Sequence, residues 1–593
     1  MTRLAIDFGA RFTDALAWDD TGARIVKLPS GELAEVLAKA LEQLALDAAR
    51  LEDVRIVTTA PLNALLARRP ARTALITTRG FGDTLQLGRQ NRVALYDPVA
   101  QSPAPRFLVE DTAIHEVGGR LDAEGAEIEP LDQEGLAAAV AAIRAAGAEA
   151  VAVCLLFAHV NSTHEEEVAQ ALAAGLPGVT VSLSHRVDPA PREYERTVST
   201  LLDAWLSATA AAEMRALSTE LVARGFSGPL LYGDGQGVLV PAATAEAERA
   251  KVLAGAPAAA ARAAAALSDA VTLAIDIGSQ SADISLSRGG EVISEPLGSL
   301  AGVPLRMTTA DMASVALGGS RAVRAEGGRL RFDGAEGAAT LDDALCLLGR
   351  LQEGKPDRLA TIAAAIGRTS EEAAQRIVAS AEAEMAAELT RFATRRNVDP
   401  TRARLVVMGG TGALLAAGVA EAMGLNRVTL PAAPAAAGAM GLALSTRRAE
   451  ARVAVDTPLA DLTTTALEKL LTDLDARLAD APGRTVWSLA LAARRPMHHF
   501  PLRFHDRPAS GEEILTAFAE AYAAAYGIAP PGPGHLFHVI AWRDAPRAPF
   551  PGVPSATTPG PGAVATAAGV VWVPEGWRLL PVDGGFVLER IAS

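Results

Sequence analysis

Short apolar runs alternate with stretches of helical spacing through the first part of the chain. The runs at 3–9 and 53–59 are largely apolar, as is typical of strands buried on both faces. Residues 33–46 instead carry apolar side chains at helical spacing. A helix is expected from near Asp132 to Gly147, followed directly by another apolar run. Strand, helix and strand in this order predict an α/β fold.

The middle of the chain continues this pattern. A long helix is predicted over 194–224, and 270–293 has two apolar runs about a Gly/Ser turn, which predicts a β-hairpin. Thr369 lies three residues before Glu372, the spacing of a capping box at a helix start. Residues 405–425 predict a strand, a glycine turn and a helix.

The texture of the sequence changes near residue 452. Proline becomes more frequent, and short strand-like runs are separated by two copies of Pro-Gly-Pro-Gly. A chain of 593 residues is too long for one core, because single cores stop growing near ~250–300 residues. We therefore expect domains at 1–180, 190–448 and 452–593.

Composition narrows the functional classes. The net charge of −14 argues against binding to nucleic acid or to an anionic membrane surface. Two cysteines give no disulfide framework, and the N-terminus lacks a long apolar leader region, so a cytoplasmic protein is expected. Long apolar stretches, such as the one broken by Arg262 and Asp269, carry charged residues, so no membrane-spanning helix is expected.

One short pattern occurs twice. Residues 6–14 and 275–283 each read as an apolar residue, Asp, any residue, Gly, four residues and a second Asp. A glycine turn between two strands can direct backbone N–H groups at an anion, and an Asp at the strand end can hold Mg²⁺ through water. Two such turns facing each other, with the glycine turn at 409–412 beyond, would grip one polyphosphate. The alternative is that Asp-x-Gly serves only to form a turn.

Several longer segments carry a family resemblance. They are "TTAPLNALLARR" (58–69), "TALITTRGFGDTLQLGRQNRVALYDP" (73–98), "AVAVCLLFAHVNSTHEEEVAQAL" (150–172), "REYERTVSTLLDAWL" (192–206), "ATLDDALCLLGRL" (339–351) and "LVVMGGTGALLAAGVAEAMGLNRVTLP" (405–431). The chain resembles the hydantoinase A/oxoprolinase family, the ATP-using subunits of hydantoinases, 5-oxoprolinases and acetone- or acetophenone-type carboxylases. The resemblance implies a duplicated, actin-like α/β core of the sugar kinase and Hsp70 type, with a smaller C-terminal α+β domain.

The resemblance also implies a reaction and a site. ATP would phosphorylate the carbonyl of a small cyclic amide or ketone, usually together with a hydantoinase B-type subunit, and the chain would bind that subunit or assemble with copies of itself. Asp7 and Asp276 would be the catalytic residues and would organise Mg²⁺ through water. The residues implied to bind the nucleotide are Gly9, Arg11, Thr13, Asp14, Gly278, Ser281, Asp283, Gly409, Gly410 and Gly412.

Both loops depart from the family pattern of Asp-x-Gly-Gly-Thr. The first has Ala10 and Arg11 in place of Gly-Thr, and the second has Ser279 and Gln280. Loss of a glycine restricts the backbone, and loss of a threonine removes a compact hydroxyl donor. ATP and Mg²⁺ binding is therefore expected to be weakened or lost, unless Arg11 compensates as a phosphate ligand. The alternative function is a catalytically impaired family member that acts as a structural or regulatory subunit.

Other candidate sites are weaker. His498 and His499 are adjacent, and neighbours in a strand point to opposite faces, which does not favour a shared zinc ion. Residues 89–92, Arg-Gln-Asn-Arg, suit either hydrogen bonding around a turn or anion binding near the cleft. No Walker-type phosphate loop is present.

Overall fold

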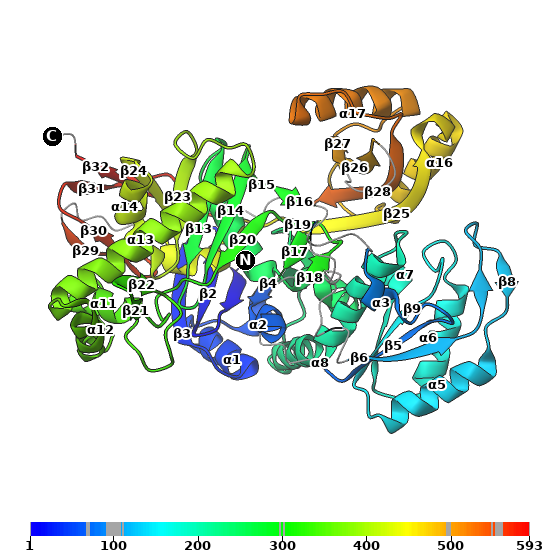
Figure 1. Cartoon of the computed structure of the whole chain (residues 1–593), viewed down its shortest axis with the longest axis horizontal. Helices are drawn as coiled ribbons and strands as arrows, with labels where there is room; N and C mark the ends of the chain where they lie inside the picture. The colour runs from blue at the N-terminus through cyan, green and yellow to red at the C-terminus, as the bar shows by residue number, and fades with distance from the viewer. Residues whose placement is uncertain are drawn as a thin grey trace.

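The structure is a computed structural model. It describes residues 2–66, 71–89, 96, 108, 112–295, 298–300, 303–493, 500–546, 550–551 and 561–591. Figure 1 shows two sheet-containing halves side by side, a further α/β unit beyond the first half, and a C-terminal unit with two helices above it.

The first half is built on a six-stranded sheet of order β12-β11-β4-β1-β2-β3. Its strands are β1 (Thr2–Phe8), β2 (Phe12–Asp19), β3 (Gly22–Pro29), β4 (Leu51–Thr58), β11 (Leu230–Gly233) and β12 (Leu239–Pro241). β1, β2 and β3 form an antiparallel meander, whereas β1, β4 and β11 run parallel. Helix α1 (Leu33–Gln43) buries its apolar side, including Val36 and Leu41, in the core of this half.

The second half repeats this strand order. β15 (Glu291–Val292), β14 (Ala282–Arg288) and β13 (Thr272–Ile277) form an antiparallel meander, and β23 (Arg404–Met408) and β24 (Arg427–Pro431) continue it in parallel. The order β3-β2-β1-β4-β11 of the first half therefore corresponds to β15-β14-β13-β23-β24. The expected duplicated actin-like core is confirmed.

The two halves share a core of small side chains. Helices α10 (Gly255–Ala265) and α15 (Ala437–Leu444) pack closely on each other and contribute most of the alanines of one buried cluster that includes strands of both sheets. A Cβ on Gly441 would lie 1.7 Å from the carbonyl oxygen of Ala259, so the approach of these helices requires glycine. This close packing explains how a chain with 4% aromatic residues fills its centre.

Several helices cover the outer side of the second half. They are α11 (Leu341–Leu347), α12 (Leu359–Ile366), α13 (Ser370–Thr394) and α14 (Gly412–Ala422). α13 begins with the expected capping box of Thr369 and Glu372. Strand β20 (Met312–Val315) pairs antiparallel with β14 of the second-half sheet.

An α/β unit is inserted into the first half. Its parallel sheet has the order β10-β9-β5-β6, with β5 (Thr73–Thr78), β6 (Thr112–Val117), β9 (Ala150–Cys154) and β10 (Thr180–Leu183). Helices α5 (Gln133–Ala145) and α6 (Thr163–Gly175) pack on it. The long helix α8 (Glu193–Ala223) contacts β9 of this unit and α1 of the first half, so it joins the two.

Shorter elements lie within and between these units. They are α2 (Ala60–Leu66), α3 (Thr84–Leu87), β7 (Arg120–Leu121), β8 (Glu127–Glu129), α7 (Ser184–Val187), α9 (Ala242–Ala247), β16 (Ser294–Glu295), β17 (Gly298–Leu300), β18 (Val303–Leu305), β19 (Thr309–Ala310), β21 (Arg324–Glu326) and β22 (Arg329–Arg331). Among the described residues, no helix is both long and apolar enough to cross a membrane.

The C-terminal unit has a four-stranded antiparallel sheet of order β25-β28-β26-β27. Its elements are β25 (Arg448–Pro458), α16 (Thr464–Arg477), β26 (Thr485–Ala492), β27 (Phe500–Phe504), α17 (Gly511–Tyr526) and β28 (His535–Asp544). The expected α+β character is confirmed.

The last strands leave this unit. β29 (Gly562–Ala565) pairs with β30 (Val570–Val573), while β31 (Trp577–Val582) and β32 (Gly585–Arg590) extend the sheet of the second half through β24. Phe586 and Leu588 are fully buried there, which provides the driving force for this return. The segment 452–593, expected as one domain, is thus divided between two units, and the first half runs past residue 180 to include β11 and β12.

Candidate functional site

The two copies of the repeated motif form equivalent hairpins, one in each half. In the first, Asp7 on β1 lies opposite Asp14 on β2, and in the second Asp276 on β13 lies opposite Asp283 on β14. In both hairpins the strands stay paired up to the residues that flank the glycine turn. Each half therefore carries two aspartates at equivalent positions of its hairpin, four in all.

Each turn is held by backbone contacts. A Cβ on Gly9 would lie 2.6 Å from the Phe12 carbonyl oxygen, so this turn requires glycine. The hydroxyl of Ser30 donates to the Gly9 carbonyl oxygen at 2.6 Å. In the second turn, the N–H of Gly278 donates to the Ser281 carbonyl oxygen at 3.0 Å, and a Cβ at Gly278 would make only an ordinary contact at 3.5 Å.

The carboxyls of the two turns interact with one another across the cleft. Burial, together with the negative charges of Asp14 and Asp276, raises the pKa of Asp7 to about 8. Burial likewise raises the pKa of Asp276 to about 7, with added contributions from Asp283 and Asp14. Lys27 of the first half contacts the Ala435 carbonyl oxygen and Arg11 contacts Ser320, so the two hairpins lie close together where the halves meet.

One cation partly compensates this cluster. Lys27 Nζ lies 2.7 Å from Asp14 Oδ1 and 3.3 Å from the carbonyl oxygen of Ala435, so it bridges from β3 to the second half. Asp283 accepts a hydrogen bond from the hydroxyl of Ser314. Asp7 Oδ1 is buried without a hydrogen-bond partner. The cleft thus carries more carboxyl groups than cations and favours either protons or an added cation.

The glycine turn after β23 lies against the second hairpin. Gly409 has φ +87°, and a Cβ there would lie 2.5 Å from Asp276 Oδ1. Gly410 is exposed, and Gly412 is the first residue of α14. Asp7 is enclosed in a similar way by α15, because a Cβ on Gly438 would lie 1.9 Å from Asp7 Oδ2. Close backbone approach therefore surrounds both aspartates.

Arg11 spans the cleft. Its Nη1 lies 3.4 Å from Asp342 Oδ2 and 3.3 Å from Ser320 Oγ, and its side chain is 48% exposed. The N–H groups of Gly319 and Ser320 donate to the carbonyl oxygens of Gly278 and Ser279. Arg11 of the first loop is thus tied to a segment that pairs directly with the second loop.

The structure brings together the residues singled out from the sequence, in three groups around one cleft: the first loop, the second loop and the glycine turn. Sequence reasoning missed Lys27, Asp342 and Gly438. Lys27 carries no local signal, because only the sheet register puts it beside Asp14. Gly438 did carry a sequence signal, since a glycine inside a helix often marks a place where another part of the chain approaches the helix backbone closely.

The other candidates gain less support. Arg89 forms an ion pair with Glu195 at 2.7 Å, while 90–92, His498 and His499 lie outside the described residues. His535 Nε2 lies 2.7 Å from Asp456 Oδ1. Within the part of the chain that the structure describes, no group of three His, Cys, Asp or Glu residues is placed to hold a metal ion.

The repeated strand order and the two equivalent hairpins define the fold as a duplicated, actin-like α/β core. The chain belongs to the hydantoinase/oxoprolinase family. The model of the hydantoinase/oxoprolinase N-terminal region matches residues 3–175, and the hydantoinase/oxoprolinase model matches residues 196–451.

Named relatives include a caprolactamase subunit and a carboxylase subunit. The caprolactamase subunit alpha of Pseudomonas jessenii is 27% identical over 495 residues, which cover 75% of this chain and 70% of that protein. The acetophenone carboxylase gamma subunit of Aromatoleum aromaticum is 32% identical over 250 residues, 38% of this chain and 34% of that subunit. Both relatives are subunits of larger enzymes by name.

Solved structures share the fold over nearly the whole chain. Nucleotide-free acetone carboxylase, described as performing ATP-dependent acetone carboxylation, superposes with a TM-score of 0.78 at 20% identity, covering 99% of both chains. The ATP-dependent caprolactamase of Pseudomonas jessenii gives a TM-score of 0.77 at 23% identity, covering 99% of this chain and 100% of that one.

Proposed function

We propose that this chain binds Mg-ATP in the cleft and transfers the γ-phosphoryl group to the carbonyl oxygen of a small cyclic amide or ketone. It would act as the A-type subunit of a hydrolase or carboxylase. The observation that carries the proposal is the pair of facing Asp-x-Gly hairpins with coupled carboxyls of raised pKa. Phosphoryl transfer depends on positioning and charge neutralisation, which such a cleft provides.

Asp7 and Asp276 are the proposed Mg²⁺-organising residues. The unpartnered, buried Oδ1 of Asp7 and the raised pKa of both carboxyls fit a missing cation. The absence of a three-residue ligand set in the described chain favours binding through water rather than direct coordination. When bound, Mg²⁺ would neutralise phosphate charge.

The glycine turns are the proposed phosphate and nucleotide contacts. Backbone groups at Gly9 and Gly278 would face the phosphates, with Thr13 and Ser281 beside them, and the turn Gly409, Gly410 and Gly412 would line the nucleotide. The N-terminus of α14, eleven residues long, begins at this turn and favours negative charge. Asp14 and Asp283 would be secondary, because Lys27 and Ser314 hold them.

The altered loops favour a second candidate, an impaired member that serves as a structural or regulatory subunit. Arg11 occupies the position of a hydroxyl donor and pairs with Asp342. An active protein would need Arg11 to exchange this carboxylate for phosphate. Because relatives are named subunits, we also propose that the chain binds a B-type partner or assembles with copies of itself. We further propose that it works as an ATP-using protein in the cytoplasm.

Calorimetry with Mg-ATP separates the two candidates. The active protein should bind Mg-ATP, and Asp276→Asn should weaken binding by at least about tenfold, because one charged contact contributes about 1.5–3 kcal/mol. Asp20→Asn, an exposed aspartate after β2, is the matched control and should bind as the wild type does. No binding at millimolar Mg-ATP would refute the active function and support the impaired one.

A further inference from the structure

A cavity of about 570 Å³ adjoins the first glycine turn on the side of the first half. Its wall includes Phe8 and Gly9 of the turn, Thr58 and Thr59 at the end of β4, and Glu213 and Ala216 of α8. Three segments distant in sequence therefore line one space that opens beside the proposed phosphate position. A cavity of this volume suits a small organic molecule.

Glu213 is the notable group of this wall. Its Oε2 is buried without a hydrogen-bond partner, and burial alone raises its pKa to about 7. Burial raises the pKa of Tyr232 on β11, and the charges of Glu246 and Glu213 add smaller contributions; the Tyr232 hydroxyl is also buried without a partner. Because Oε2 has no exposed surface, it faces into the protein and not the cavity. Glu213 as a residue nevertheless lines the cavity wall, where a carboxyl of raised pKa is a candidate for proton transfer.

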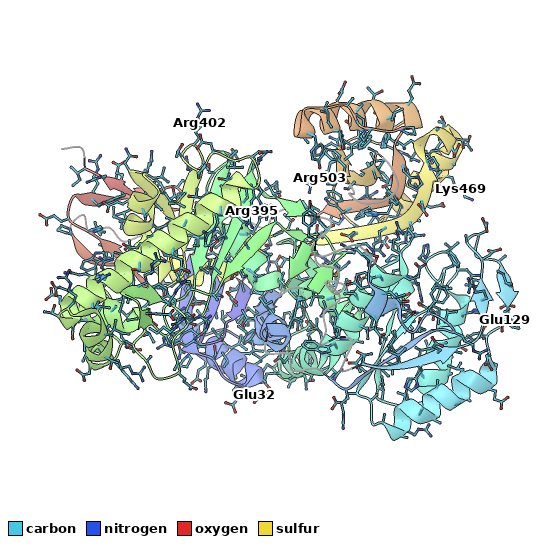
Figure 2. All side chains as sticks on the ribbon, viewed as in Figure 1. Glu32, Glu129, Arg395, Arg402, Lys469 and Arg503 are labelled. Atoms are coloured by element: carbon cyan, nitrogen blue, oxygen red, sulfur yellow. The ribbon has the colours of Figure 1, made fainter. Side chains whose placement is uncertain are left out.

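The second carboxyl of this wall behaves differently. Glu32, which precedes α1, is exposed, and Figure 2 shows it at the surface of the first half. The cavity thus has one carboxyl that reaches solvent and one whose oxygen is enclosed. The raised pKa of Glu213 suits a base working near neutral pH.

The proposed reaction requires a base. When a lactam oxygen attacks the γ-phosphorus, the new O–P bond replaces the bond from phosphorus to the bridging oxygen of ADP, and the lactam nitrogen must lose its proton. For a ketone, the proton leaves the α-carbon as the enol phosphate forms. In both cases one proton departs close to the carbonyl oxygen, so one carboxylate at a fixed place can serve either substrate.

We propose that this cavity receives the carbonyl substrate and that Glu213 is the general base that accepts its N–H or α-C–H proton. The proposal rests on the proposed function. The walls of Phe8, Leu33, Ala60 and Ala216 suit the apolar part of a small ring or ketone. The hydroxyl side chains of Thr58 and Thr59 supply hydrogen-bonding groups on the same wall.

The test measures ADP formation by the full chain with Mg-ATP and four probes: caprolactam, 5-oxoproline, acetone and acetophenone. At least one probe should stimulate ADP formation in the wild type. Glu213→Gln should reduce that stimulation by about 100-fold or more while leaving Mg-ATP affinity within about twofold, as expected for loss of a general base. Glu42→Gln, at an exposed position of α1 that is not part of the cavity wall, is the matched control and should retain full stimulation.

The pH profile gives a second readout that a structural role would not move. Stimulated turnover in the wild type should rise with pH to a plateau above about 7, and Glu213→Gln should lose this rise. Glu213→Asp should retain the rise at reduced rate. Full stimulation in Glu213→Gln would overturn the role of Glu213.

The outcomes keep the two proposals separate. A wild type that binds no Mg-ATP refutes the proposed function itself. A wild type that binds Mg-ATP but responds to none of the four probes overturns the assignment of the cavity to a lactam or ketone and leaves the nucleotide site standing.

Discussion

Asp7→Asn tests whether ionisation of Asp7 destabilises the folded protein. The Asp7 carboxyl has its pKa raised from 3.8 to about 8 by burial and by neighbouring carboxyls. A folded-state pKa above the unfolded value means that the folded protein binds more protons than the unfolded one. The free energy of unfolding must therefore fall as pH rises between these two values.

The magnitude follows from the shift. Each pH unit in this window costs up to about 1.4 kcal/mol per carboxyl, so the loss from pH 5 to pH 8 is on the order of 3–4 kcal/mol for Asp7. Asn cannot ionise and keeps the shape of the side chain. The variant should match the wild type near pH 5 and exceed it in stability at pH 8.

Urea denaturation at pH 5 and pH 8 without nucleotide measures this difference. Asp20→Asn is the control and should follow the wild-type pH dependence, because Asp20 is exposed. Saturating Mg-ATP should stabilise the wild type at pH 8 but not Asp7→Asn. A variant less stable than the wild type at pH 8 would refute the argument, since it would mean that the Asp7 charge is stabilised in the folded cleft.

Mg-ATP affinity should increase by at least about tenfold between pH 6.5 and pH 9, because cation binding needs ionised carboxyls whose pKa values are raised; calorimetry showing a flat profile would contradict this. Arg11→Ala should weaken Mg-ATP binding about 10–100-fold if Arg11 passes from Asp342 to a phosphate, whereas Asp342→Asn should strengthen it by freeing Arg11; unchanged affinity in both would remove Arg11 from the site. Gly441→Ala should lower the thermal midpoint, since its Cβ would lie 1.7 Å from the Ala259 carbonyl oxygen; a midpoint equal to that of the wild type would show that the helices can separate without cost.

Much of the fold could be predicted because it is encoded locally. The helix expected from Asp132 is α5, capped by the Asp132 carboxylate, which accepts from the N–H of Gly135. The capping box at Thr369 and the hairpin of the second motif formed where expected. Caps, turns and apolar periodicity depend on residues within a few positions of one another, so a single sequence reveals them.

The limits of the C-terminal domain could not be predicted. Its proline-rich texture favoured one unit from 452 onward, yet β31 and β32 join the sheet of the second half. A short apolar strand such as Gly585–Arg590 fits any sheet edge of suitable register, and its own residues do not say which edge is open.

The sequence by itself determined the duplicated motif, and with it the four carboxyls and the glycine turns. Only the tertiary structure decided how these groups meet. It set Lys27 beside Asp14, Gly438 against Asp7, Arg11 across to Asp342, and Glu213 on the wall of the adjoining cavity. The reason is physical: the pKa of a carboxyl depends on burial and on nearby charges, and some of these neighbours, such as Asp276 for Asp7, come from elements hundreds of residues away in the sequence.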